Sequence, residues 1–218
     1  MKKGSEFESR RASMVACQLV ARGIQSPLVL EAMGRVAREK FVPKGMQDRA
    51  YDDGPLPIGA GQTISQPYIV ALMADALDLR GGEKVLDIGT GSGYAAAVIA
   101  CIASKVFSME RVPELAERAA RTLVSEGFDS VVVRCGDGTL GWPEHQPFDG
   151  IVVAAGAPAV PEALKHQLAV GGCLVIPVGS RHSVQSLLRI TRVSGSEFRT
   201  ENFGAVRFVP LLGEQGWS

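Results

Sequence analysis

Three glycines, Gly89, Gly91 and Gly93, form a Gly-Thr-Gly-Ser-Gly loop that could hold a ligand containing a nucleoside. The loop follows the short apolar run Lys84–Ile88 and precedes a stretch with helical character, so it lies at a strand-to-helix turn. Glycine lacks a Cβ, which permits a tight turn and lets the backbone approach a ligand. The loop alone is also compatible with a tight connection that binds nothing.

Two carboxylates follow the next two expected strands. Glu110 comes about 20 residues after the glycines, where its oxygens could accept hydrogen bonds from both ribose hydroxyls. Asp137 lies between Gly136 and Gly138, and it could accept a bond from an adenine amino group. Alternatively, Glu110 is an exposed carboxylate at a helix start and Asp137 belongs to an ordinary Asp-Gly turn. Three ordered features at strand ends favour a nucleoside site.

The spacing of the loop separates two classes of cofactor. A dinucleotide loop needs a small residue three positions after its second glycine, where the helix packs on the strand beside the pyrophosphate. This sequence has Tyr94 there. S-adenosylmethionine carries no phosphate and requires close approach to its amino-acid and ribose parts, which Gly89, Gly91 and Gly93 allow. The sequence therefore predicts S-adenosylmethionine rather than NAD.

An alternation of short apolar strands and amphipathic helices must position these residues. We expect strands at 84–88, 105–109, 131–134, 150–154 and 173–178, and helices at 94–102, 113–125 and 161–168. This order predicts an α/β, Rossmann-like fold with a mostly parallel central sheet and helices on both faces. The β-like segments 184–192 and 199–209 predict an antiparallel C-terminal edge.

The N-terminal part is expected to be a helical extension followed by a loop. Residues 1–13 are polar and aperiodic, and we interpret them as a disordered leader or a remnant of cloning. One helix is expected at 14–22, and a second begins at Ser26 and Pro27. The glycine- and proline-rich segment 41–67 predicts an irregular functional loop, after which Pro67 starts a helix.

The chain 14–218 is expected to be a single domain. It divides into N-terminal helices and a substrate loop (14–82), a cofactor-binding core (83–180) and C-terminal strands (181–218). Lys and Arg together number 23, as do Asp and Glu, so the formal net charge is zero and neither a nucleic acid nor a membrane is expected as a partner. We expect a cytoplasmic monomer without a metal site, whose four cysteines are reduced core thiols.

From Met14 to Pro210 the sequence resembles the protein-L-isoaspartate (D-aspartate) O-methyltransferase family. The glycine loop is shared by many methyltransferases, but PLPIGAGQTISQP is specific to this family. The resemblance is carried by QLVARGI, REKFVP, AYDDGPLPIGAGQTISQPYIVA, VLDIGTGSGY, GDGTLGWP, PFDGIVVAAGAP, QLAVGGCLVIPVG and VRFVPL. It implies the fold of a class I S-adenosylmethionine-dependent methyltransferase.

The resemblance also implies an activity and a set of site residues. The family methylates the α-carboxylate of L-isoaspartyl residues, and more weakly D-aspartyl residues, in damaged proteins and peptides; the ester then cyclises to a succinimide. Ser65 would be the active-site residue, and Thr63, Ile64, Val206 and Phe208 would lie near the substrate. The cofactor would be held by Asp87, Gly89, Thr90, Gly91, Ser92, Gly93, Glu110, Asp137 and Gly138. Many bacterial members have Glu where this sequence has Asp87.

The chemistry agrees with this interpretation. A carboxylate, with an ordinary pKa of about 4, is already ionised at neutral pH, so methyl transfer to it needs no general base. The enzyme acts by positioning, and His145, His166 and His182 are expected to be solvated or structural. Ser65 could instead only cap the helix that starts at Pro67.

Two other functions remain open from the sequence. A methyltransferase of the same fold could act on a small acid or a dedicated peptide, because the cofactor residues do not choose the acceptor. A catalytically silent protein that binds S-adenosylmethionine would keep the same fold.

Overall fold

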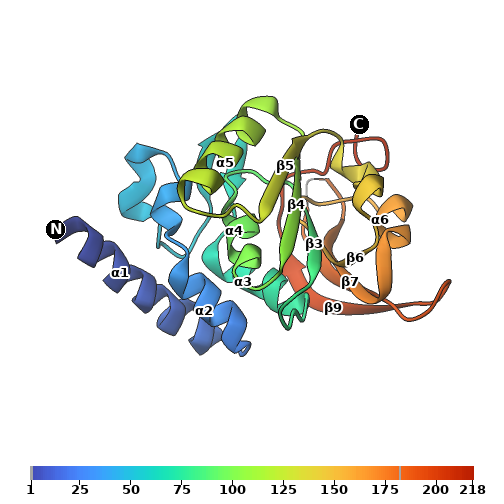
Figure 1. Cartoon of the computed structure of the whole chain (residues 1–218), viewed down its shortest axis with the longest axis horizontal. Helices are drawn as coiled ribbons and strands as arrows, with labels where there is room; N and C mark the ends of the chain where they lie inside the picture. Colours follow the sequence, from blue (N-terminus) through green and yellow to red (C-terminus); the bar gives the residue numbers. More distant parts are fainter. Residues whose placement is uncertain (1, 182) are drawn as a thin grey trace.

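A seven-stranded sheet forms the centre of the computed structural model, which describes residues 2–181 and 183–218. The strands lie in the order β5-β4-β3-β6-β7-β8-β9 (Figure 1). Strands β3 to β7 are parallel, whereas β8 and β9 are each antiparallel to the preceding strand. The expected parallel sheet with an antiparallel C-terminal edge is confirmed. The strands are β3 (Lys84–Ile88), β4 (Lys105–Glu110), β5 (Val131–Cys135), β6 (Phe148–Val153), β7 (Leu168–Gly179), β8 (Gln185–Arg192) and β9 (Phe198–Val206).

The order of the strands reverses at β3. The chain runs outward from β3 through β4 to β5, and then returns to the other side of β3 as β6 and β7. Loops that leave β3 and β4 therefore diverge from the loop that leaves β6. Ligands of open α/β sheets bind in the crevice that such a reversal creates at the carboxyl ends of the strands.

Alternate residues of each central strand face two separate cores. Val85 and Val106 belong to one core and Leu86 and Phe107 to the other, as the two-residue period of a strand requires. The first core lies under α3 (Pro67–Ala76), α4 (Tyr94–Ala100) and α5 (Pro113–Ser125). The second lies under η5 (Gly138–Leu140), η6 (Pro143–His145) and α6 (Glu162–His166), on the opposite side of the sheet (Figure 1). Helices thus cover both faces, as expected.

The N-terminal residues are helical, so the prediction of a disordered leader at 1–13 is wrong for the residues described. The chain forms α1 (Lys2–Met14), the π-helix η1 (Val15–Leu19), the 3₁₀ turn η2 (Val20–Arg22) and α2 (Pro27–Arg35). Phe7 is 9% exposed and Met14 is 1% exposed. Residues seven apart share a helix face. This pair of apolar anchors in a polar segment was too sparse to reveal the helix.

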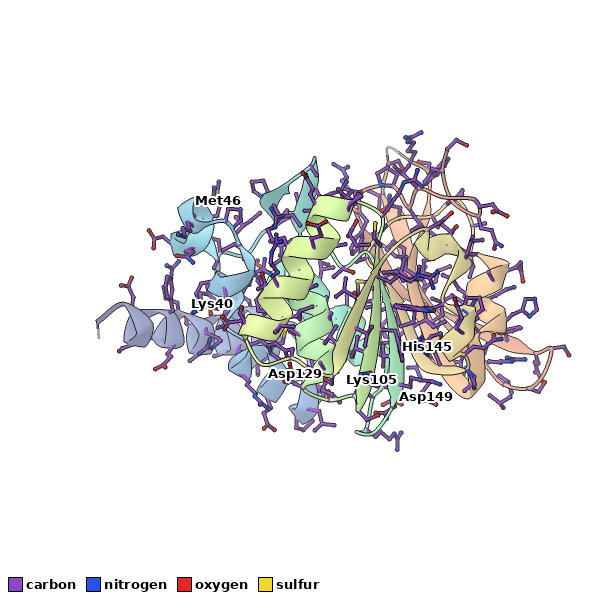
Figure 2. All side chains as sticks on the ribbon, turned by 45° about the horizontal axis from the view of Figure 1, so that its top comes forward. Lys40, Met46, Lys105, Asp129, His145 and Asp149 are labelled. Carbon is purple, nitrogen blue, oxygen red and sulfur yellow. The ribbon has the colours of Figure 1, made fainter. Side chains whose placement is uncertain are left out.

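The segment before α3 is more ordered than the irregular loop expected for 41–67. It contains the 3₁₀ helices η3 (Arg38–Phe41) and η4 (Lys44–Arg49) and a hairpin of β1 (Leu56–Gly59) and β2 (Gln62–Ile64). Ala60 (φ 50°) and Gly61 (φ 69°) make the turn with two successive left-handed residues. Two-residue hairpin turns of this kind favour Asn-Gly. Because the sequence has Ala-Gly here, it did not predict the hairpin. Lys40 of η3 lies beside α5 (Figure 2), with its Nζ 3.6 Å from Glu126 Oε1.

The cysteines differ in burial, so the prediction of four core thiols is only partly right. Cys173 is buried and Cys101 is half-buried, but Cys17 and Cys135 are exposed. Cys135 ends β5, the strand at one edge of the sheet, and Cys17 lies in η1. Their apolar sequence neighbours gave no sign of this exposure. Across the described residues, no helix combines the length and apolar character needed to cross a bilayer.

Candidate active site

A cavity lies at the carboxyl ends of β3, β4 and β6, where the strand order reverses. Residues from six parts of the chain form most of its lining. They are 62–65 of the hairpin, 89–92 with Tyr94 and Ala95, 109–112 at the end of β4, Gly138 after β5, 154–155 after β6, and 209–212 near the C-terminus. Val70 of α3 and Ile88 of β3 complete the wall. The cavity therefore joins the predicted cofactor loop to the predicted substrate segment.

The glycine loop has a backbone that requires glycine. Gly89, Gly91 and Gly93 have φ values of 91°, 54° and 89°, in the left-handed region that side chains disfavour. The amides of Gly89 and Thr90 both donate to Met109 O, at 2.8 and 3.2 Å. This fixes the loop against the end of β4. The backbone of the loop thereby forms one wall of the cavity without side chains in the way.

Glu110 lies in the cavity wall at the end of β4 and is only 7% exposed. Its Oε2 accepts a hydrogen bond from Gly91 N at 2.8 Å, and its Oε1 accepts one from Val112 N at 2.9 Å. A carboxylate oxygen can accept two bonds, so each oxygen keeps capacity for one more donor. Two adjacent hydroxyls, such as those of a ribose, match that capacity.

Asp87 supports the loop from outside the lining that the described residues form. It is fully buried; Ser108 Oγ donates to Asp87 Oδ2 at 2.6 Å, and Thr90 Oγ1 lies 2.6 Å from Ser108 Oγ. Because Ser108 donates to Asp87, the Thr90 hydroxyl donates to Ser108. Oδ1 of Asp87 finds no hydrogen-bond partner within the described chain. Burial, the largest cause, and the nearby Glu110 charge together raise the pKa of Asp87 to about 6, while the hydrogen bond from Ser108 opposes the rise.

The raised pKa predicts a pH dependence of stability. An unfolded aspartate titrates near 3.8, so the folded chain binds more protons between there and about 6. The free energy of unfolding should therefore fall as pH rises through this interval and stay lower above it. We expect Asp87→Asn to flatten the decrease in Tm between about pH 4 and about pH 6. Parallel Tm curves for the two proteins would contradict this, and Glu117→Gln, on an exposed face of α5, is the control.

Asp137 is directed toward the C-terminal segment rather than into the cavity. Its Oδ1 accepts bonds from Thr139 N (2.9 Å) and Thr139 Oγ1 (2.7 Å), and its Oδ2 accepts one from Glu214 N (2.8 Å). Desolvation acts to raise the pKa of Asp137, but these bonds together outweigh it and hold the pKa below its ordinary value. An adenine amino group would have to share these oxygens.

Gly138, the residue after Asp137, lines the cavity directly. A Cβ at this position would lie 2.4 Å from Ile88 Cγ2, so a side chain would collide with the neighbouring strand. Only glycine leaves this part of the wall open, which agrees with the expectation that room is needed beside a base.

Residues 209–212 form a wall that the sequence did not reveal. Gly156 N donates to Val209 O at 2.8 Å, and Leu211 N and Trp217 Nε1 donate to Gly156 O at 2.9 and 3.0 Å. These bonds join the C-terminal segment to the loop after β6. The sequence has no period here that would predict them, and only the VRFVPL motif pointed to the region.

Val206 and Phe208 lie outside the cavity lining that the described residues form. Val206 is buried opposite Gln185, at the start of β8. The Gln185 amide accepts from Phe208 N at 2.8 Å and donates to Phe208 O at 3.3 Å. The main-chain groups of Phe208 are therefore already paired. Any contact of these two residues with a substrate would be made by other groups.

The substrate segment reaches the cavity through Thr63, Ile64 and Ser65. Helix α3 begins with Gln66 as its N-cap, and no side chain caps it. Ser65 therefore does not have the capping role that was its alternative. Among the histidines described, His145 (Figure 2) stacks on Phe107 with ring centroids 4.0 Å apart, and His166 has a side chain 71% exposed. His182 lies outside the described residues.

A model of the protein-L-isoaspartate(D-aspartate) O-methyltransferase family matches residues 10–216 of the chain. The chain belongs to this family. Protein-L-isoaspartate O-methyltransferase 2 of Marinobacter nauticus is 65% identical over 216 residues, which cover 99% of each chain. Protein-L-isoaspartate O-methyltransferase of Syntrophus aciditrophicus is 55% identical and covers 97% of this chain and 98% of its own.

Solved structures agree with this assignment. A protein-L-isoaspartate O-methyltransferase superposes with a TM-score of 0.85 at 29% identity, covering 94% of this chain and 67% of its own. A putative protein-L-isoaspartate O-methyltransferase from Plasmodium falciparum, in complex with S-adenosyl-L-homocysteine, gives 0.79 at 27% identity and covers 93% and 98%. The Rossmann-like class I methyltransferase fold is thereby confirmed.

The site fits the cofactor of the protein-L-isoaspartate methyltransferases, S-adenosylmethionine. The left-handed glycines and Gly138 provide walls free of side chains, and Glu110 retains acceptor capacity for a ribose. No group of three or more His, Cys, Asp or Glu residues that could hold a metal ion occurs in the described part of the chain.

Proposed function

We propose that this chain methylates the free α-carboxylate of L-isoaspartyl residues in damaged proteins and peptides, and more weakly D-aspartyl residues. The ester would then cyclise to a succinimide and so begin repair. The observation that carries the proposal is that 62–65, from the family-specific motif, line the same cavity as the glycine loop and Glu110. Acceptor and methyl donor would meet there.

The proposed mechanism assigns positioning roles to residues of this chain. When bound, S-adenosylmethionine supplies an electrophilic methyl group on a sulfonium. Glu110 would accept bonds from the ribose hydroxyls, and the backbone of 89–93 would hold the amino-acid part. The Ser65 hydroxyl would donate to one oxygen of the acceptor carboxylate and so hold the other oxygen toward the methyl donor, whose sulfur would leave as the thioether of S-adenosylhomocysteine. Since the carboxylate is already ionised, no side chain has to remove a proton.

The substrate side of the proposal extends beyond Ser65. Thr63 and Ile64 would contact the isoaspartyl residue, and the segment containing Val206 and Phe208 would support the chain around it. Residues 63–64 and the segment 206–208 would together receive the substrate as an extended peptide. We also propose a monomer in the cytoplasm, with isoaspartyl-containing proteins as its partners.

A paired-peptide assay tests the proposed function. Two synthetic peptides of one sequence, with an isoaspartyl or a normal aspartyl residue, are incubated with the protein and labelled S-adenosylmethionine. We expect label to enter only the isoaspartyl peptide. Methylation of a small acid but of neither peptide would indicate a different acceptor, and calorimetric binding of S-adenosylhomocysteine without turnover would indicate a silent binding protein. Either result would reject the proposal.

A further inference from the structure

Arg38 is a fully buried cation next to the active site. It lies at the start of η3, has 0% exposure, and ranks among the largest fully buried side chains of the protein. Arginine is almost never fully buried without a charged partner. Yet no carboxylate forms an ion pair with Arg38 among the residues described. Burial lowers the pKa of Arg38 below its ordinary value.

The neighbouring carboxylate does not compensate this charge. Glu39, the next residue, accepts a hydrogen bond from the Tyr51 hydroxyl at 2.5 Å and is itself buried. Keeping a cation here without a carboxylate is unfavourable for stability, and a well-packed apolar side chain of similar size would avoid the desolvation. The hydrogen bonds and the aromatic contact of Arg38 indicate a role in the active site rather than in stability.

The guanidinium joins two chain segments to the cofactor side of the cavity. Its Nε donates to Ala50 O at 2.7 Å and its Nη2 donates to Ser65 O at 2.8 Å. Its central carbon lies 4.8 Å from the centre of the Tyr94 ring, in a cation–π contact. Ser65 and Tyr94 both line the cavity, and Tyr94 directly follows the glycine loop.

We infer that Arg38 is a positioning residue that holds Ser65 at a fixed place relative to the methyl donor. The planar guanidinium donates in two directions at once while its face rests on an aromatic ring, an arrangement that lysine cannot reproduce. Because α3 starts without a side-chain cap, the Arg38 bond to Ser65 O is a specific restraint on this residue. The inference rests on the proposed role of Ser65 and adds the group that sets its position.

Arg38→Lys tests the inference, because lysine keeps the positive charge but lacks the planar guanidinium that donates to Ala50 O and Ser65 O at once. We expect kcat/KM for an isoaspartyl peptide to fall about tenfold, while the dissociation constant of S-adenosylhomocysteine, measured by calorimetry, stays within about twofold. A residue that only stabilises the fold would lower Tm and weaken both properties together. An equal loss of peptide turnover and cofactor affinity would therefore overturn the inference.

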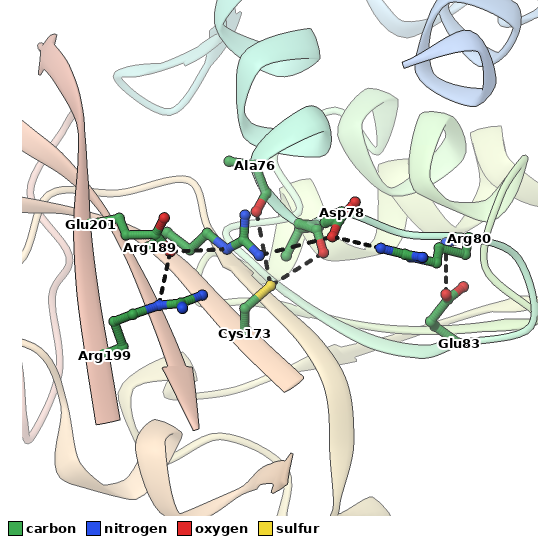
Figure 3. A network of polar contacts seen from close by, with 9 residues as sticks. Ala76, Asp78, Arg80, Glu83, Cys173, Arg189, Arg199 and Glu201 are labelled. Carbon is green, nitrogen blue, oxygen red and sulfur yellow. Dashed lines mark hydrogen bonds and ion pairs between the residues drawn. The ribbon is translucent and has the colours of Figure 1, made fainter. Parts of the chain in front are cut away.

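Arg189 of β8, which is not among the described residues that line the cavity, provides the matched control. Its side chain is 19% exposed, and its Nε and Nη2 lie 3.8 Å from Glu201 and 4.0 Å from Asp78 (Figure 3). In the same network, the buried Cys173 donates to Ala76 O at 3.9 Å (Figure 3). Arg189→Lys should reduce Tm without changing the ratio of peptide turnover to cofactor affinity.

A double-mutant cycle separates positioning of Ser65 from other effects of Arg38. If Arg38 acts through Ser65, then adding Arg38→Lys to Ser65→Ala should reduce kcat/KM by less than about twofold further. Fully additive losses, or full activity of Ser65→Ala, would overturn the inference. If the wild-type enzyme proves to methylate another carboxylic acid, the same cycle is run with that acid, so the two proposals fail separately.

Arg38→Met is a second test variant, used if Arg38→Lys does not fold. Methionine fills much of the space and removes the buried charge, which offsets the loss of the donors to Ala50 O and Ser65 O, so Tm should fall no further than in Arg38→Lys while the peptide kcat/KM falls at least as far. If neither variant folds, Arg38 is a structural residue and the inference is wrong.

Discussion

Glu110→Ala is expected to raise the dissociation constant of S-adenosylhomocysteine by about a hundredfold, equivalent to about 3 kcal/mol. The carboxylate would make two charge-assisted hydrogen bonds to the ribose, and each such bond contributes about 1.5–3 kcal/mol. Its removal also leaves the amides of Gly91 and Val112 without their acceptor. The glycine loop would then lose one of its links to the end of β4 and keep the bonds from Gly89 N and Thr90 N to Met109 O. Isothermal titration calorimetry measures the change directly.

Glu110→Gln sharpens this prediction. Each carboxylate oxygen accepts a backbone N–H, from Gly91 or from Val112, so an amide NH₂ at either place would confront another donor. We expect an intermediate loss, about tenfold in affinity. Glu114→Ala, at the exposed first turn of α5, is the control and should leave binding unchanged. An affinity in Glu110→Ala within about threefold of wild type would show that the ribose is held elsewhere.

Ser65→Ala is expected to lower kcat for an isoaspartyl peptide by about a hundredfold while leaving cofactor affinity nearly unchanged. A hydrogen bond from a hydroxyl to a carboxylate contributes about 1.5–3 kcal/mol, and its loss also lets the nucleophile rotate away from the line of attack. Single-turnover kinetics with saturating cofactor isolate this step from product release. The cofactor contacts lie in 89–93 and Glu110, so they should persist.

The matched control for Ser65→Ala is Ser125→Ala. Ser125 ends α5 on the exposed surface, where its hydroxyl donates to Thr122 O at 2.8 Å. This variant loses a serine hydroxyl of similar bonding capacity away from the cavity, and its kcat should equal that of wild type. Equal kcat values for Ser65→Ala and wild type would refute the role of Ser65, and a matching loss of cofactor affinity would point to a collapsed cavity instead.

The central sheet could be predicted because its signals are local. Strand β3 and helix α5 have the bounds expected from the sequence, since apolar runs, an N-terminal proline and closing polar residues lie within each segment. Glu110 and Gly138 could be placed for the same reason, because Glu110 ends β4 and Gly138 lies three residues after the end of β5. Helix α6 is shorter than expected, as β7 already begins at Leu168.

The parts that were missed depend on contacts between distant residues. The bond from Glu214 N to Asp137 Oδ2 spans 77 positions and turns the carboxylate toward the C-terminal segment. The Gln185 amide pairs with the main chain of Phe208 over 23 positions, so these main-chain groups are not free to pair with a peptide. Arg38 was missed as well, because a charged residue in a short polar stretch gives no sign that it will be buried.

The C-terminal wall determines when the cavity is completed during synthesis of the chain. Residues 209–212 line one side of the cavity; Gly156 bonds to Val209 and Leu211 within them, and Asp137 bonds to Glu214 just after them. During translation the glycine loop and Glu110 emerge long before this wall is made. We therefore expect a nascent chain that has made only the central strands to lack a complete cavity.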